Sequence, residues 1–176
     1  MRATPIAVAA LAAALLLSAC DNGNGGDDGS NGKAAKTGDA CTLDGVGVQV
    51  GASAAPTAGD SGDVTVTITN NGSKCTLNGF PAVRLQAGDT TSTVPSDKAA
   101  KAQKLTLAKN ATASFTITYV RGEAGGKQSL AVKTAKFSLP GSSAAHGITW
   151  SYGDVALKGG ADRPNASVTA FQQAGD

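Results

Sequence analysis

Apolar and polar residues alternate along several short stretches of the chain after residue 41. The clearest stretch is 112–119, TASFTITY, in which apolar side chains alternate with Thr and Ser. Residues 64–69, VTVTIT, alternate in the same way and run into the turn signal Asn70-Asn71-Gly72. A period of two places alternate side chains on opposite faces of a sheet, so these stretches predict half-buried β-strands. Further strands are predicted around Val46, Val48 and Val50; Val83 and Leu85; Leu130 and Val132; Phe137 and Leu139; Ile148, Trp150 and Tyr152; and Val168 and Ala170, with Phe171 out of phase.

Two stretches depart from this alternation. The pattern changes phase between Val132 and Phe137, which predicts a bulge or a break. Residues 97–104 carry lysines at every third position and predict at most one helical turn on a connecting loop. These lysines are either a solvated loop face or a contact for anionic lipid or wall polymer. About seven to eight short strands with Gly and Pro turns predict an all-β fold, an antiparallel β-sandwich, over residues 41–176.

The N-terminus has the pattern of a leader. Residues 6–17 form an uninterrupted apolar run behind Arg2. The run is too short for a membrane-spanning helix, which needs about 20 residues, and it fits a signal peptide. Leu17-Ser18-Ala19-Cys20 resembles the lipobox of bacterial lipoproteins. The resemblance implies a signal peptide at 1–19 and a membrane anchor of diacylglycerol and palmitate-type chains on Cys20. The alternative is an ordinary secreted protein in which Cys20 pairs elsewhere.

Residues 20–40 are predicted to be the lipidated Cys and a flexible tether. Gly, Asp, Asn and Ser dominate the segment, and it holds no aliphatic residue larger than Ala. Such a chain cannot bury enough surface to offset the entropy of ordering, and 20 residues of it span roughly 25 Å. A calcium loop starting at Asp27 is excluded because Gly29 and Gly38 stand where oxygen ligands are needed.

The balance of charge and the number of cysteines restrict the classes of protein that fit this sequence. Arg2 leaves with the leader, so fourteen of the fifteen Lys and Arg remain against thirteen Asp and Glu. This balance gives no reason to expect nucleic acid as a partner. With Cys20 lipidated, Cys41 and Cys75 form an even pair, either a disulfide or a metal-binding thiol pair. An exported protein favours the disulfide, which would close a loop of about 35 residues and stabilise the fold by roughly 3–4 kcal/mol.

The segment 70–81 carries a family resemblance. It reads NNGSKCTLNGFP and matches the pattern N-x-G-x-x-C-x-L-x-G-[FY]-P, in which Gly72 and Gly79 permit positive φ and Pro81 fixes the chain direction. The pattern resembles actinobacterial lipoproteins of the domain-of-unknown-function 4232 family, over roughly residues 41–171. The resemblance implies an immunoglobulin-like sandwich, a Cys41–Cys75 bond and a location on the outer face of the cytoplasmic membrane. It implies no activity and no catalytic residues.

The residues needed for common catalytic sites are sparse. His146 is the one histidine, and a Ser-His-Asp site would need Asp154 beside it, with no G-x-S-x-G elbow present. The chain has no Met beyond Met1 for a thioether copper site and only Glu123 as glutamate. We therefore expect no catalytic, cofactor-binding or metal site. Trp150, Tyr152 and His146 are the residues considered for a ligand or partner surface, although Trp150 and Tyr152 are also expected in the core.

The function that best fits these observations is a binding class. The sequence predicts a membrane-anchored, extracytoplasmic, non-enzymatic interaction domain at the cell envelope. Its partner would be an envelope protein, a wall polymer or a small ligand. The alternatives are an extracytoplasmic enzyme or accessory subunit with a loop site near His146, formed with Tyr152, Asp154 and Arg163, and a purely structural envelope lipoprotein.

Overall fold

The computed structural model describes residues 39–160 and 162–173. The predicted signal peptide, the lipidation site Cys20 and the predicted tether up to residue 38 lie outside the described residues. The described chain forms β-strands joined by turns and loops, with one turn of 3-10 helix, η1 (Leu43–Gly45), and no α-helix.

The strands form two larger sheets and two short pairs. The larger sheets have the orders β1-β2-β7-β12, with β13 also pairing with β7, and β10-β9-β4-β5. The short pairs are β3 with β6 and β11 with β8. The strands are β1 (Val46–Ser53), β2 (Ser61–Asn70), β3 (Cys75–Asn78), β4 (Ala82–Ala87), β5 (Thr90–Val94), β6 (Lys104–Leu107), β7 (Thr112–Val120), β8 (Ser129–Leu130), β9 (Thr134–Ser138), β10 (His146–Thr149), β11 (Val155–Ala156), β12 (Ala166–Val168) and β13 (Gln172–Gln173).

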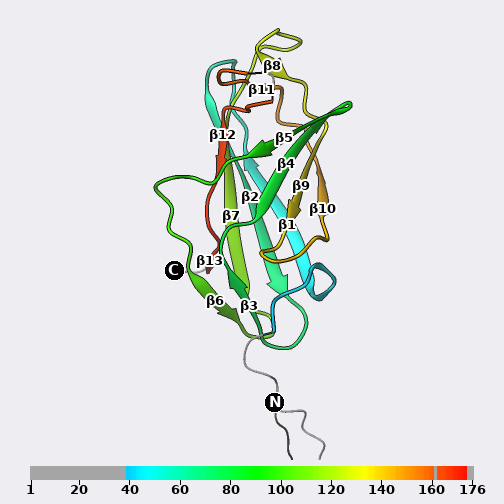
Figure 1. The fold of residues 1–176 in the computed structure, drawn as a ribbon, viewed down its shortest axis with the longest axis vertical. Coiled ribbons are helices and arrows are strands. Elements are labelled where there is room, and N and C mark those ends of the chain that lie inside the picture. The colour runs from blue at the N-terminus through cyan, green and yellow to red at the C-terminus, as the bar shows by residue number, and fades with distance from the viewer. Residues whose placement is uncertain (1–38, 161, 174–176) are drawn as a thin grey trace, which may run out of the picture. The chain divides into compact units, whose positions relative to one another are not determined.

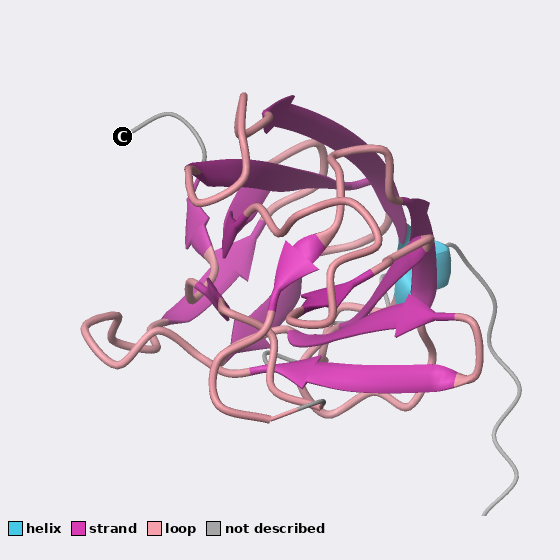
Figure 2. Cartoon of the chain, turned by 90° about the horizontal axis from the view of Figure 1, so that it is seen from above, coloured by secondary structure: helices cyan, strands magenta, loops and turns pink. Residues whose placement is uncertain are grey.

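All strand pairs are antiparallel, and the two larger sheets pack face to face around one core (Figure 1; Figure 2). The β3–β6 pair lies at one end of the sandwich and the β8–β11 pair at the other (Figure 1). The predicted all-β antiparallel sandwich is therefore confirmed. The described chain begins at Asp39 beside β3, because Ala40 forms a parallel bridge with Thr76.

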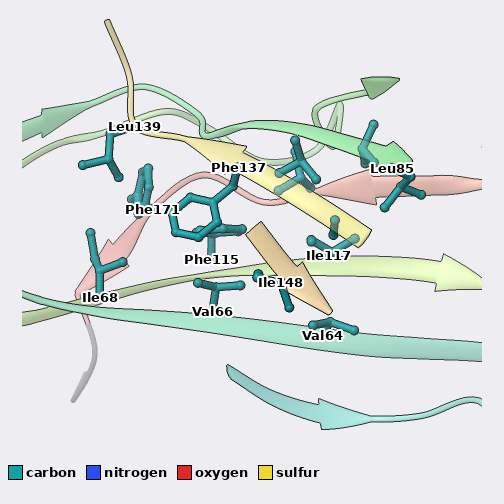
Figure 3. Packing of buried hydrophobic residues seen from close by; sticks show 14 of the residues in the cluster. Val64, Val66, Ile68, Leu85, Phe115, Ile117, Phe137, Leu139, Ile148 and Phe171 are labelled. Carbon is teal, nitrogen blue, oxygen red and sulfur yellow. The ribbon is translucent and has the colours of Figure 1, made fainter. Parts of the chain in front are cut away.

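The core is built from the alternating residues of the central strands. Val64, Val66 and Ile68 of β2 are fully buried, and the Thr residues between them face outward and are half-buried. From β7, Phe115 points across the sandwich and makes edge-to-face contacts with Phe137 and Phe171, each with ring centroids 5.3 Å apart (Figure 3). Edge-to-face aromatic packing adds to the stabilisation from burial alone.

The predicted change of phase between Val132 and Phe137 is a break between two strands. β8 pairs with β11, whereas β9 pairs with β4 and β10, so the two segments belong to different sheets. Between them the amide of Val132 donates to the carbonyl of Leu130 at 2.8 Å in a tight turn. The change of phase follows this turn, since the next buried residue after Val132 is Ala135.

Three predictions at the element level need correction. The strand predicted through Ile148, Trp150 and Tyr152 ends at Thr149. The helical turn predicted over 97–104 is a bend, in which Ala100 donates to the Asp97 carbonyl at 3.2 Å and Lys104 already begins β6. Strands β3 and β6 were not predicted because each has four residues, with only two alternating apolar side chains, and β5 was not predicted because it is rich in Thr and Ser.

Candidate functional site

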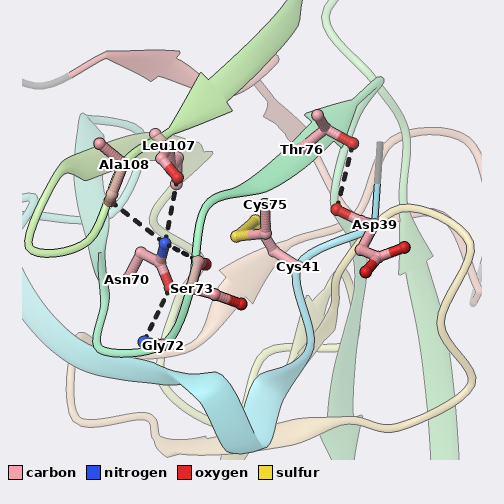
Figure 4. The surroundings of a disulfide bond; sticks show 9 residues. All are labelled: Asp39, Cys41, Asn70, Gly72, Ser73, Cys75, Thr76, Leu107 and Ala108. Atoms are coloured by element: carbon pink, nitrogen blue, oxygen red, sulfur yellow. Dashed lines mark hydrogen bonds between the residues drawn. A yellow bond between two sulfur atoms is a disulfide. The ribbon is translucent and has the colours of Figure 1, made fainter. Parts of the chain in front are cut away.

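The two cysteines predicted to pair are joined at the start of the described chain. Cys41 and Cys75 form a disulfide with their Cα atoms 4.9 Å apart, and both are buried. The amide of Cys41 donates to the carbonyl of Thr76 at 3.0 Å, and the amide of Thr76 donates to the carbonyl of Asp39 at 2.9 Å. The hydroxyl of Thr76 also donates to the Asp39 carbonyl, at 3.5 Å (Figure 4). The bond and this ladder fix the point where the chain enters the domain.

Asn70 organises the turn beside the disulfide. It is 2% exposed, and its Nδ2 donates to the carbonyls of Ser73, Leu107 and Ala108 at 2.9–3.1 Å (Figure 4). Its Oδ1 accepts from the amide of Gly72 at 3.0 Å. Asn70 therefore ties the end of β2 to the loop that carries Cys75 and to the end of β6. The first residue of the sequence pattern thus has a structural role.

The two glycines of the same pattern behave differently. Gly79 has φ +119°, a backbone conformation that other residues rarely adopt, so the prediction of positive φ is correct at this position. Gly72 is not among the positive-φ residues, so the freedom that glycine permits is not used there. Its role is to donate its amide to Asn70 in the turn.

Trp150 and Tyr152, considered for a ligand surface, belong to an aromatic cluster with Tyr119. Trp150 is 5% exposed, and its ring lies 5.0 Å from each of the two tyrosine rings. Its indole N–H donates to the carbonyl of Gly153 at 2.7 Å. The buried indole leaves no face for a ligand to stack on, so the surface role predicted for Trp150 is corrected to a core role. Tyr152 is half-buried against it.

The same cluster fixes the loop between β1 and β2. The hydroxyl of Tyr119 donates to the carbonyl of Tyr152 at 2.8 Å and accepts from the amide of Ala55 at 3.3 Å. Nη1 of Arg121 donates to the carbonyls of Ala55 and Pro56 at 2.8 and 2.7 Å. These contacts use the polar groups of the cluster within the domain, so they indicate a structural role.

The structure does not bring His146 and Asp154 together. His146 is exposed at the first residue of β10, with its ring 5.5 Å from that of Phe137. Asp154 lies beyond the other end of β10, where its Oδ2 accepts from the amide of Gly125 at 2.9 Å. The described residues contain no group of three or more His, Cys, Asp or Glu side chains arranged to hold a metal ion.

Several open clefts mark the surface of the described residues. One, about 540 Å³, lies at the β8–β11 end and is lined by Arg121, Glu123, Lys127 and neighbouring residues. A second, about 390 Å³, lies between the Pro95 segment and the hairpin that carries Lys158 and Arg163. A third, about 250 Å³, lies on the outer face of the four-stranded sheet.

The third cleft contains residues that the sequence analysis did not select. Arg84 of β4 and Lys136 of β9 line it with three serines, Ser138, Ser142 and Ser143. Period-two alternation places Arg84 and Lys136 on polar faces, which was the available signal. Their proximity depends on the register between β4 and β9, which a single sequence does not reveal.

These features define a disulfide-stapled antiparallel β-sandwich with open surface clefts. A family model described as a domain of unknown function (DUF4232) matches residues 41–172, more than half of the chain. The chain belongs to this family. Searches of curated proteins and of solved structures found no match. Among the described residues, no helix is long and apolar enough to span a membrane.

Proposed function

We propose that this protein is a lipid-anchored lipoprotein that presents a non-enzymatic β-sandwich binding domain on the outer face of the cytoplasmic membrane. The lipobox at 17–20 supplies the anchor, and the Gly- and Asp-rich segment up to residue 38 supplies the tether. The predicted tether ends two residues earlier than residue 40, because Ala40 is bridged to Thr76 and Asp39 accepts from the Thr76 amide. Two acyl chains on Cys20 would hold the protein stably, because each buried CH₂ contributes about 0.8 kcal/mol.

The observation that carries this proposal is that the two ends of the domain differ. The chain enters at Asp39 and Cys41, where the disulfide and the ladder to Thr76 fix it beside β3. The β8–β11 end, with the cleft of about 540 Å³, is the opposite end of the sandwich (Figure 1). A domain tethered at the first end exposes its clefts and the second end to neighbouring molecules.

The non-enzymatic part of the proposal rests on side-chain placement. His146 and Asp154 lie toward opposite ends of β10, and Asp154 is already bonded to the backbone at Gly125. General acid–base catalysis needs partners within hydrogen-bond reach, about 2.6–3.2 Å. The polar atoms of the buried cluster around Tyr119 are likewise engaged with backbone groups.

Metabolic labelling with a clickable fatty acid tests the anchor. The wild-type protein should carry the label and stay with membranes, whereas Cys20→Ala should lose both properties. Cys41→Ala/Cys75→Ala, which removes the other two thiols, is the matched control and should keep the label. Undiminished labelling of Cys20→Ala would overturn the anchor. Protease added to intact cells or spheroplasts should digest the domain, and full protection in both would contradict the outward location.

A further inference from the structure

The outer face of the four-stranded sheet carries basic side chains without acidic neighbours on its strands. Arg84 and Lys136 stand directly opposite each other in the register of β4 and β9, and both are exposed. The strands β4, β5, β9 and β10 contain no Asp or Glu. We use the name basic face for the surface formed by five cations: Arg84, Lys136, Lys98, Lys158 and Arg163.

This pairing opposes stability. Like charges directly opposite in an antiparallel sheet are destabilising, whereas opposite charges there are stabilising. On either side of the pair, the same row continues with Thr93 of β5 and Gly147 of β10, which carry no charge. The two cations therefore lack a compensating partner within the sheet, and a bound anion would supply one.

The cleft over this pair has the donors that a phosphate group requires. Its volume is about 250 Å³, and Ser138, Ser142 and Ser143 line it beside the two cations. Oγ of Ser142 accepts from the amide of Ala144 at 3.1 Å, which leaves its hydroxyl hydrogen free to donate. A tetrahedral phosphate accepts hydrogen bonds in several directions, and guanidinium, ammonium and hydroxyl groups are its usual donors.

The basic face continues beyond β5. Thr93, which stands opposite Arg84, also lines the cleft of about 390 Å³ with Lys98, Lys158 and Arg163. A hairpin brings two of these cations together, because the amide of Lys158 donates to the carbonyl of Arg163 at 2.8 Å. Asp162 is the one acidic residue lining this cleft. Five cations thus extend across the sheet and over its β5 edge.

The arrangement of the cations favours a polymer over a single ion. Arg84 lines the first cleft and stands opposite Thr93, which lines the second, so the two clefts adjoin across one strand spacing of about 4.8 Å. A single phosphate can occupy one of the two clefts, whereas a chain of linked phosphate groups can place a group in each. We infer that the basic face binds a linear phosphodiester polymer, with phosphate groups at Arg84–Lys136 and further groups at Lys98, Lys158 and Arg163. This inference rests on the proposed function, because it names the partner class of the displayed domain.

The test uses the full-length protein purified in non-ionic detergent, with fluorescently labelled poly(glycerol phosphate) as the probe. Arg84→Gln/Lys136→Gln should weaken binding by roughly tenfold, because charge-assisted bonds to phosphate are lost, and should reduce the salt dependence of binding. Lys104→Gln/Lys109→Gln removes the same charge from exposed positions at and beyond β6 and should leave binding unchanged. An equal loss in both double variants would overturn the inference.

Charge reversal separates binding from folding. Lys136→Glu places a carboxylate opposite Arg84, so the variant should melt at a higher temperature than the wild type while losing the polymer. This variant keeps the test decisive even if a neutral variant folds poorly. Unchanged polymer binding by Lys136→Glu would overturn the inference.

Competition identifies the form of the phosphate. Unlabelled polymer should displace the probe at far lower phosphate concentration than orthophosphate or glycerophosphoglycerol, the soluble form of a lipid headgroup. Equal displacement per phosphate would reduce the site to a single-anion site and overturn the polymer assignment. Equal affinity for single-stranded DNA would assign the face to nucleic acid instead. Because fatty-acid labelling of Cys20 is measured separately, a failure here leaves the proposed anchor standing.

Discussion

Single polar atoms in the interior determine much of what individual substitutions should do. Tyr119 and Trp150 place hydroxyl and indole groups against backbone carbonyls, and each is bonded. Ser92, on the inner side of β5, is 1% exposed, and its Oγ has no hydrogen-bond partner among the described residues. Buried polar groups are usually bonded. Removing a bonded group should therefore destabilise the domain, whereas removing the unbonded Ser92 hydroxyl should stabilise it.

Removing the Ser92 hydroxyl should stabilise the domain. Leaving a buried hydroxyl unsatisfied costs about 1–3 kcal/mol, and Ser92→Ala removes that cost with a minimal loss of volume. We expect the free energy of unfolding in urea to rise by about 1 kcal/mol. Ser114→Ala, on the half-buried outer face of β7, is the control and should change it by less than about 0.5 kcal/mol. A clear loss of stability in Ser92→Ala would show that the hydroxyl is satisfied.

Removing the Tyr119 hydroxyl should destabilise the domain. Tyr119→Phe keeps the ring in contact with Trp150 but leaves the carbonyl of Tyr152 and the amide of Ala55 without their partner. Chemical denaturation should show a loss of about 2 kcal/mol. Tyr152→Phe is the matched control, because Tyr152 contributes its carbonyl rather than its hydroxyl, and it should be close to neutral. Equal effects of the two variants would contradict the assigned role of Tyr119.

At the scale of elements, the turn between β2 and β3 depends on one side chain. Asn70 bonds to three carbonyls and one amide, so Asn70→Ala removes four hydrogen bonds to buried and part-buried backbone groups. The expected loss of unfolding free energy is about 3 kcal/mol. Asn71→Ala, at the exposed neighbouring position, should cost less than about 1 kcal/mol. Hydrogen exchange should locate the added opening of Asn70→Ala at β3 and β6, and exchange unchanged there would contradict this account.

The strands also show how much of the fold could be predicted from the sequence alone. β2 and β7 were predictable because Val64 to Ile68 and Phe115 to Tyr119 alternate strictly with Thr and Ser. β5, with the sequence TTSTV, was not, because Thr and Ser occupy its inner and outer positions alike. Trp150 shows a related limit. The alternation indicates that Trp150 shares a face of the predicted strand with Ile148, but it does not indicate which face is buried.

The site residues show the same limit more strongly. Cys41 and Cys75 were predictable by counting, since two thiols remain once Cys20 is assigned to lipid. Arg84 and Lys136 were not, because they are far apart in the sequence and meet only through the register of β4 and β9. Register depends on which faces are buried and on turn geometry, which are properties of the folded sheet.

At the scale of the whole molecule, the N-terminal boundary of the folded domain can be tested directly. The hydrogen bonds that close the edge beside β3 begin at Asp39, and the disulfide follows at Cys41. A fragment of residues 39–176 should therefore unfold in urea with the same free energy as the full chain, within about 0.5 kcal/mol.

A fragment of residues 42–176 lacks both the ladder and Cys41. It should be less stable by about 4 kcal/mol, because the unfolded chain is no longer constrained by a closed loop. Reducing the longer fragment should bring it close to the shorter one. A large deficit in the oxidised 39–176 fragment would contradict this boundary, because it would mean that residues before Asp39 stabilise the sandwich.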